Sequence, residues 1–254
     1  MTKMESAAHS VINKCLNVQK GESVLIISNS YLDEIAKYLF DAAKKRTKFC
    51  YALHIGDIDR KAGIDDTISK LMRSMDVIIA ATCPSISHTD ARRKACHRGA
   101  RIISMPNILS ETFSRLASAD YVKIGRRSLK LKDILSISNE ALVTAPNGTN
   151  MHISFGKKRG YADIGILDKP GLFSNLPAGE ASIAPDEGKS EGVLVVDSGM
   201  GVNFQEKERL ALTFKNGKAY RISGDIAAER LRRQLSPFGP NSRLIAEFGI
   251  GTND

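Results

Sequence analysis

Short apolar runs alternate with helical patterns through the first half of this chain, and that alternation constrains its fold more than any other feature. The runs are rich in β-branched residues, as in strands buried on both faces of a sheet. The expected strands are residues 23–28, 49–55, 76–81 and 100–104. Apolar residues at helical spacing predict helices over residues 4–17, 33–46, 65–74 and 89–99. This order predicts an α/β domain with a doubly wound, mainly parallel sheet.

The pattern changes near residue 139, where helical spacing fades and glycine, proline and asparagine become frequent. Asn216-Gly217 lies between two short apolar stretches, which is a strong signal for a two-residue β-hairpin. The expected strands are residues 142–144, 150–155, 192–197, 209–214 and 218–222, with a helix over residues 225–235. We therefore expect two domains, a Rossmann-like α/β domain over residues 1–138 and a β-rich α+β domain over residues 139–254.

The composition is that of a globular protein, with 42% hydrophobic and 26% charged residues among 254. No apolar run approaches the roughly 20 residues that a membrane-spanning helix needs, and the N-terminus lacks the apolar core of a secretory signal. These features predict a cytoplasmic protein with no membrane partner. The cysteines form no C-x-x-C pair, so we expect reduced structural thiols at Cys15, Cys50, Cys83 and Cys96.

The net charge of +9 raises the question of a nucleic-acid partner. The basic residues are dispersed in short groups, few aromatic residues stand among them, and the chain contains no tryptophan. Stacking platforms for single strands are therefore poor. Solvated basic faces account for the charge equally well, and we do not expect nucleic acid as a partner.

Several common site motifs are absent from the sequence. There is no phosphate-binding G-x-x-x-x-G-K-[ST], no G-x-G-x-x-G after the first strand, no zinc-binding H-E-x-x-H and no nucleophile elbow G-x-S-x-G. Dinucleotide binding would then rest on architecture alone, which is an analogy and not a site. His54 and His97 are expected to be structural. His88 is expected on the surface beside a helix cap at Thr89 or Asp90, with a place in a substrate pocket as the alternative.

Glu180 is one candidate for chemistry. It follows a Pro-x-Gly turn in the string N-L-P-A-G-E, where proline restricts the backbone and glycine permits a sharp bend. A carboxylate on such a rigid turn suits a metal ion, which requires its oxygen ligands within narrow distances. The alternative is that Glu180 caps a loop or faces solvent, as most glutamates do.

Glu247 is the second candidate. It stands in the apolar, glycine-rich string I-A-E-F-G-I-G-T-N, which predicts partial burial of its side chain. A buried carboxylate needs a cation or hydrogen-bond donors. Because Glu180 and Glu247 are far apart in the sequence, only the fold could bring them together.

Several strings of the sequence resemble the aminopeptidase T family of metallo-aminopeptidases and their archaeal leucyl aminopeptidase relatives. They are N-L-P-A-G-E-A-S-I-A-P, E-G-V-L-V-V-D-S and I-A-E-F-G-I-G-T-N, with S-I-S-H-T-D-A-R-R and A-P-N-G-T-N upstream. The resemblance implies that Glu180 and Glu247 bind divalent metal ions (zinc, cobalt or manganese) and that their carboxylates face a common cavity. It also implies a homodimer that releases N-terminal amino acids from peptide substrates.

One departure from that family concerns the metal site. Family members continue past G-I-G-T-N into a segment that supplies further metal ligands, whereas the last histidine of this sequence is His152. Because a catalytic zinc normally needs three protein ligands, we expect an incomplete metal site and little or no aminopeptidase activity, and the residues identify no general base. The alternative is a catalytically inactive family member that acts as a binding or assembly protein.

Overall fold

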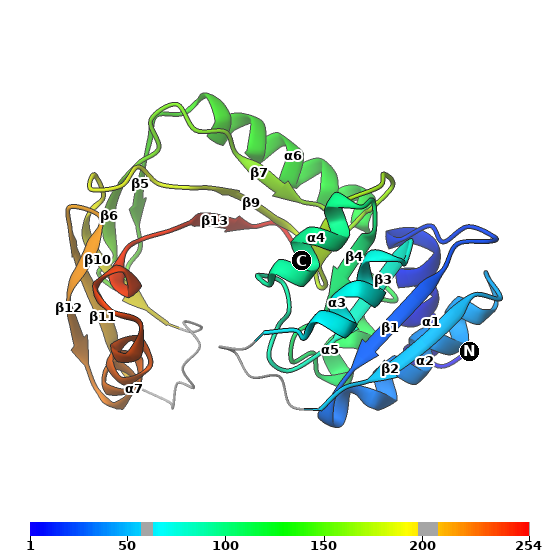
Figure 1. Cartoon of the computed structure of the whole chain (residues 1–254). Coiled ribbons are helices and arrows are strands. Elements are labelled where there is room, and N and C mark those ends of the chain that lie inside the picture. The colour runs from blue at the N-terminus through cyan, green and yellow to red at the C-terminus, as the bar shows by residue number, and fades with distance from the viewer. Residues whose placement is uncertain (57–62, 198–207, 254) are drawn as a thin grey trace. The chain divides into compact units, whose positions relative to one another are not determined.

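The computed structural model describes residues 1–56, 63–197 and 208–253, which divide into two compact units (Figure 1). Unit 1 comprises Met1–Ser128, Asp163–Glu180 and Thr252–Asp254, and unit 2 comprises Leu129–Ala162 and Ala181–Gly251. The chain therefore passes between the units four times, whereas the sequence indicated one boundary near residue 138. Each passage brings a segment that is distant in sequence into the same core, and hydrophobic periodicity carries no signal for such exchanges.

Unit 1 is built on a five-stranded sheet in the order β2-β1-β3-β4-β8, and all neighbouring strands are parallel. The strands are β1 (Val24–Ser28), β2 (Cys50–His54), β3 (Val77–Ala81), β4 (Arg101–Ser104) and β8 (Phe173–Asn175). The predicted α/β class with a mainly parallel sheet is thereby confirmed. The strand β8 was not expected, because three residues are too few to display a periodic pattern.

Helices cover both faces of this sheet (Figure 1). They are α1 (Lys3–Ser10), α2 (Asp33–Lys44), α3 (Asp66–Arg73), α4 (Asp90–His97) and α5 (Ser110–Arg115). Apolar residues of α1, α2 and α5 share one buried cluster, and those of α3 and α4 share another. Every residue of β1, β3 and β4 is buried between the two clusters, as the apolar runs of β1 and β3 predicted. In β4 the buried residues include Arg101.

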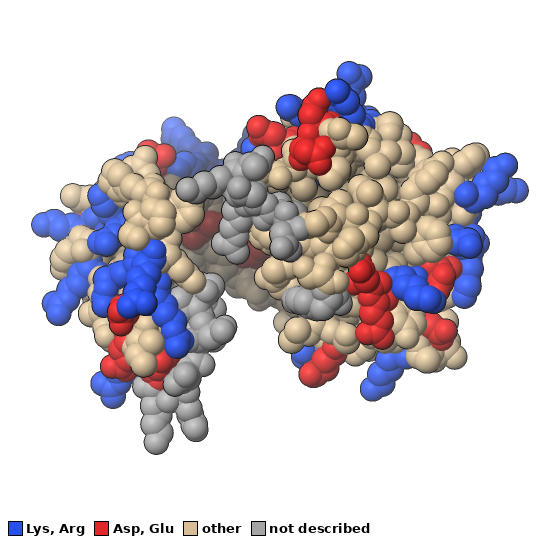
Figure 2. Space-filling model, turned by 60° about the horizontal axis from the view of Figure 1, so that its bottom comes forward, with Lys and Arg blue, Asp and Glu red and all other residues tan. Residues whose placement is uncertain are grey.

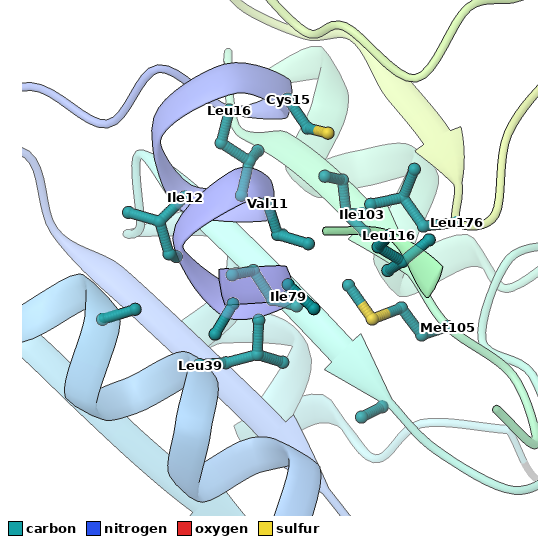
Figure 3. Packing of buried hydrophobic residues seen from close by; sticks show 14 of the residues in the cluster. Val11, Ile12, Cys15, Leu16, Leu39, Ile79, Ile103, Met105, Leu116 and Leu176 are labelled. Atoms are coloured by element: carbon teal, nitrogen blue, oxygen red, sulfur yellow. The ribbon is translucent and has the colours of Figure 1, made fainter. Parts of the chain in front are cut away.

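The expected helix over residues 4–17 is formed by two segments in succession. The α-helix α1 is followed by a π-helical segment, Val11–Cys15. Figure 3 shows Val11, Ile12 and Leu16 from this region packed among buried side chains of α2, β3 and β4. The N-terminal segment is therefore part of the core of unit 1, and its apolar residues bury against three other elements.

The 17-residue helix α6 (Tyr121–Ile137) was not expected from the sequence. Its first half supplies Tyr121 and Ile124 to the core of unit 1, and its second half supplies Leu135 to the core of unit 2. A helix that changes core half-way has no single apolar face, so helical periodicity could not reveal it.

Unit 2 contains an antiparallel sheet in the order β12-β11-β10-β6-β5 and a small sheet in the order β13-β9-β7. The first is formed by β5 (Glu140–Thr144), β6 (Asn150–Ser154), β10 (Glu191–Val196), β11 (Leu210–Lys215) and β12 (Lys218–Gly224). The second is formed by β7 (Tyr161–Asp163), β9 (Glu180–Ile183) and β13 (Phe248–Gly251). The helix α7 (Ile226–Leu235) packs on the larger sheet, and the predicted hairpin at Asn216-Gly217 joins β11 to β12.

Charged side chains of both signs are mixed on the surface. On the face shown in Figure 2, Lys and Arg side chains lie beside Asp and Glu side chains and do not form one continuous basic area. Several pairs are spaced three or four residues apart along helices, among them Lys37 with Asp41 and Arg233 with Glu229. In the described parts of the chain, no helix is long and apolar enough to cross a membrane, and all four cysteines are free thiols.

Candidate functional site

The carboxyl edge of the parallel sheet in unit 1 is a candidate site, because doubly wound sheets bind ligands at this edge, where the strand order reverses. Here the reversal lies between β1 and β3. Asn29, directly after β1, joins these two strands. Its Nδ2 donates to the Cys83 carbonyl at 2.7 Å and its Oδ1 accepts from the Cys83 N–H at 2.8 Å. This buried amide fixes the edge of the sheet at the reversal.

A second polar group lies at the ends of β1 and β2. The Ser28 hydroxyl donates to Asp33 Oδ1 at 2.5 Å, and His54 Nδ1 lies 2.9 Å from the same oxygen. Both contacts lower the pKa of Asp33, and the Ser28 hydrogen bond contributes most. Because the side chains of Asp33 and His54 are half exposed, they form a solvated polar corner of this edge. A structural role for His54 stays a prediction.

The loop before α4 is tied to β8. The Ser87 hydroxyl donates to Asn175 Oδ1 at 2.9 Å, and Arg92 Nε donates to the Ser87 carbonyl at 2.8 Å. Thr89 caps α4 by accepting from the Arg92 N–H at 3.3 Å, as one of the two predicted caps, and His88 beside it is exposed. These bonds hold the loop before α4 against the carboxyl end of β8.

Asp163 anchors the end of β8 from the other side, and the sequence reasoning missed it. Its carboxylate accepts from the Ser174 hydroxyl, from the Asn175 N–H at 3.2 Å and from the Gly165 N–H at 3.4 Å. Burial raises the pKa of Asp163 despite these donors. An aspartate directly before I-G-I-L in a mostly apolar stretch was the available signal for a buried acid.

The segment from Leu176 to Glu180 leads from β8 to β9, and it meets the C-terminal G-T-N string. The Thr252 N–H donates to the Gly179 carbonyl at 2.8 Å, and Asn253 Nδ2 donates to the Ala178 carbonyl. Gly179 has a φ of +125°, and a Cβ there would lie 2.9 Å from atoms of Asn253 and Ile124. The two strings that the sequence singled out thus meet through their backbones, at the residue before Glu180.

The two predicted metal ligands have different settings. Glu180 is exposed at the start of β9 and is the last residue of the second segment of unit 1, Asp163–Glu180. Glu247 directly precedes β13 in unit 2 and is also exposed, so the expected partial burial of its side chain was wrong. Its apolar neighbours Ile245 and Phe248 pack against the core of unit 2 in its place. A common cavity for the two carboxylates stays a prediction.

The residues present do not by themselves make a metal centre. Within residues 1–56, 63–197 and 208–253, no three His, Cys, Asp or Glu side chains come close enough to hold a metal ion. A catalytic metal normally needs at least three protein ligands.

A family model described as NicX, 2,5-dihydroxypyridine 5,6-dioxygenase, matches residues 3–254. The chain belongs to this family. It is 22% identical over 261 residues to the 2,5-dihydroxypyridine 5,6-dioxygenase of Pseudomonas putida strain KT2440, covering 94% of this chain and 72% of that relative. The solved structure of the 2,5-dihydroxypyridine dioxygenase from the same strain superposes with a TM-score of 0.82 at 20% identity, covering 99% of this chain and 77% of the other.

The NicX assignment corrects the resemblance to aminopeptidase T. The solved structure of wild-type AmpT from Thermus thermophilus has a TM-score of 0.70 at 15% identity, covering 98% of this chain and 78% of the other, so it shows a shared fold alone. Assignment to the aminopeptidase T family, hydrolase activity on peptides and the inactive binding protein were wrong as readings of this chain.

The structure gives a physical reason why those strings misled. The strings P-A-G-E and G-T-N are hydrogen-bonded to each other at Gly179 and Thr252. Their glycine and threonine are therefore needed for the backbone conformation and contacts at this point of the fold. The fold imposes this backbone requirement, whatever reaction the protein catalyses. Proteins with different chemistry can therefore share the strings.

Proposed function

We propose that this chain carries out, or contributes to, ring-opening dioxygenation of a dihydroxylated pyridine. The observation that carries the proposal is the match of the NicX family model to residues 3–254. The name of the Pseudomonas putida relative describes a reaction at C5 and C6 of 2,5-dihydroxypyridine. In such a reaction both atoms of dioxygen enter the substrate, the C5–C6 bond breaks, and the ring carbons supply the electrons that reduce dioxygen.

The carboxyl edge of unit 1 is the proposed place for the substrate. It offers hydroxyl, amide and imidazole groups from the ends of neighbouring strands, which suit hydrogen bonds to ring hydroxyls and a ring nitrogen. The edge is held by Asn29 and Asp163, so these groups are arranged before a ligand arrives. Arrangement in advance lowers the entropic cost of binding.

The family is metal-dependent, so a metal cofactor is part of the proposal. The described residues of this chain do not form a complete metal site. When bound, such a metal supplies the one-electron chemistry that dioxygen requires. Zinc has no redox chemistry, so among the metals that the resemblance to aminopeptidase T implied, cobalt and manganese suit an oxygenase better than zinc does. Iron(II) suits an oxygenase as well. Glu180 and Glu247 stay the predicted carboxylate ligands.

Oxygen uptake by the full chain tests the proposal. We expect consumption of dioxygen with 2,5-dihydroxypyridine and added iron(II), about one molecule per substrate, and both atoms of labelled dioxygen in the product. Catechol, which lacks the ring nitrogen, serves as the control substrate. Uptake that does not depend on the pyridine, or a product carrying one labelled oxygen, would contradict the proposal.

A matched pair of variants tests the role of Glu180. Glu180→Gln removes the charge of the proposed ligand and should lower turnover at least about 100-fold, the loss typical when a group that stabilises charge in the reaction is removed. Glu187→Gln changes an exposed glutamate in a nearby turn and should leave turnover unchanged. Equal rates for the two variants would remove Glu180 from the mechanism.

The homodimer is a separate proposal, supported only by the resemblance described above. Light scattering coupled to size-exclusion chromatography measures it directly. A mass near twice the 27.7 kDa of one chain would support it, and the mass of a single chain would contradict it.

A further inference from the structure

The four places where the chain leaves or enters unit 1 are joined by hydrogen bonds within that unit. Unit 1 breaks after Ser128, resumes at Asp163, breaks after Glu180 and resumes at Thr252. The Ser128 hydroxyl lies 2.7 Å from the Thr252 hydroxyl and 3.5 Å from the Asp163 carbonyl. The Thr252 N–H donates to the Gly179 carbonyl at 2.8 Å. We call Ser128, Asp163, Gly179 and Thr252 the crossing cluster.

The hydroxyl pair at the centre of the crossing cluster is shielded from water. Ser128 is 0% exposed and Thr252 is 6% exposed. The Ser128 hydroxyl also donates to two backbone carbonyls, that of Ile124 at 3.1 Å and that of Asp163 at 3.5 Å. Because these carbonyls engage its single proton, we assign the Thr252 hydroxyl as the donor of the pair. A buried donor that loses its partner costs more than an ordinary hydrogen bond contributes, so this pair strongly favours one arrangement.

The hydroxyl pair acts on Glu180 through the backbone. Thr252 is held by Ser128 through its side chain and by Arg127, which donates to its carbonyl at 3.2 Å. Thr252 in turn holds the carbonyl of Gly179, the residue directly before Glu180. The position of Thr252 therefore fixes the peptide from which the Glu180 side chain extends.

We propose that Ser128 and Thr252 are positioning residues for Glu180. Their buried hydroxyl pair holds the peptide between Gly179 and Glu180 in place and limits where the Glu180 carboxylate reaches. A reacting or binding carboxylate needs placement within a fraction of an ångström, which an unanchored loop does not provide. The part of this inference that concerns turnover rests on the proposed oxygenase function, whereas the anchoring of the segment does not.

Amide hydrogen exchange of the whole protein tests the anchoring. In Ser128→Ala, the Thr252 hydroxyl is left buried without an acceptor, and exchange in peptides covering residues 176–183 should quicken about tenfold or more. Thr252→Val leaves Ser128 bonded to Ile124, so its effect should be smaller. Thr252→Ser keeps the hydroxyl and should restore most of the protection.

Ser138→Ala is the matched control, because the Ser138 hydroxyl also donates to a carbonyl four residues earlier, that of Ile134 in α6, but Ser138 is only partly buried. It should leave exchange over residues 176–183 unchanged. Unchanged exchange there in both Ser128→Ala and Thr252→Val would overturn the anchoring. So would faster exchange spread equally over β1 and β3, because the effect would then be global.

Turnover of 2,5-dihydroxypyridine supplies the second measurement. If the wild type is active, Thr252→Val should lower kcat with a smaller change in KM, and Thr252→Ser should recover it, because positioning of Glu180 changes the reaction step more than binding. An unchanged kcat in Thr252→Val and Ser128→Ala would overturn the positioning role. An inactive wild type would contradict the proposed function, and the exchange experiment would still decide the anchoring.

Discussion

The two main sheets of this protein bury their strands in different ways. In the parallel sheet of unit 1, all five residues of β3 are buried, and the same is true of β1. In the antiparallel sheet of unit 2, the residues of β6 alternate between exposed and buried. The parallel sheet has helices on both faces, whereas the antiparallel sheet packs one face on the core with α7. An unbroken apolar run thus marks a strand buried on both faces, and an alternating run marks a strand buried on one face.

The largest effect should come from consecutive residues in the parallel sheet. Ile78 and Ile79 of β3 are both 0% exposed and belong to the clusters on opposite faces. We expect Ile78→Ala and Ile79→Ala each to lower the free energy of unfolding by about 4 kcal/mol, because each leaves a cavity. Urea unfolding followed by circular dichroism measures this. A loss below about 1 kcal/mol for either one would break the two-faced description.

Arg101 tests how the buried sheet accommodates a charge. It lies in β4, and its guanidinium donates to the carbonyls of Leu16 and Leu167 and pairs with Glu22 at 2.6 Å. Arg101→Met should cost about 3 kcal/mol, because two carbonyls and a carboxylate lose their donor. Arg233→Met breaks an exposed pair and should cost less than about 0.5 kcal/mol. Similar losses for the two variants in urea unfolding would mean that burial does not increase the contribution of Arg101 to stability.

Alternation in unit 2 predicts unequal effects for neighbouring residues. In β11, Leu212 is buried in the core, whereas Thr213 is only partly covered. We expect Leu212→Ala to cost about 2.5 kcal/mol and Thr213→Ala less than about 1 kcal/mol. The same unfolding assay applies. Equal losses at the two positions would show that the antiparallel sheet is covered on both faces.

The hairpin of unit 2 should respond to a change in its turn. Gly217 has a φ of +69°, and a Cβ there would lie 2.9 Å from the backbone nitrogen of Gly188. Gly217→Ala should therefore cost about 1 kcal/mol or slightly more. Gly251→Ala, at a strand position with open space, should cost less. A thermal shift assay compares them, and a smaller loss at Gly217 would mean that the turn rearranges freely.

The smallest effect concerns pH. Burial raises the pKa of Asp163 in the folded protein above its ordinary value of 3.8. The folded state therefore holds this proton to higher pH than the unfolded state, and stability falls as pH rises through that interval. Asp163→Asn does not titrate, so its melting temperature relative to the wild type should rise as pH increases above about 4. The asparagine also accepts more weakly from the Asn175 N–H, which lowers the melting temperature by the same amount at every pH. This loss does not change how the difference in melting temperature depends on pH. A flat difference, or one that falls with pH, would contradict the burial of this carboxyl.

Much of the fold was predictable because its signals are local. The run V-L-I-I-S became β1, the spacing over residues 33–46 became α2, and Asn216-Gly217 became the hairpin turn. The elements that were missed depend on distant partners. The strand β8 exists through its pairing of Ser104 with Asn175, and α6 changes core along its length. Neither strand pairing with a distant segment nor a change of core produces a hydrophobic periodicity in the local sequence.

The candidate site was predictable only as a set of unusual residues. Glu180 stood out because it follows a rigid Pro-x-Gly turn, and Glu247 because its neighbours are apolar. The same two strings form the backbone hydrogen bond between Gly179 and Thr252, which is a structural role. The reaction they implied was wrong, since a shared fold can carry different chemistry. Asp163 was missed, because only its burial beside Ser174 distinguishes it from a surface aspartate.

By itself the sequence determined the parallel sheet of unit 1, since strands buried on both faces have apolar residues at consecutive positions, and it predicted a β-rich second part. It also determined the hairpin at Asn216-Gly217. The tertiary structure alone decided that Ser128, Asp163, Gly179 and Thr252 meet at one point. Those contacts join segments far apart along the chain, and their energy comes from burying polar groups together, which no local pattern encodes.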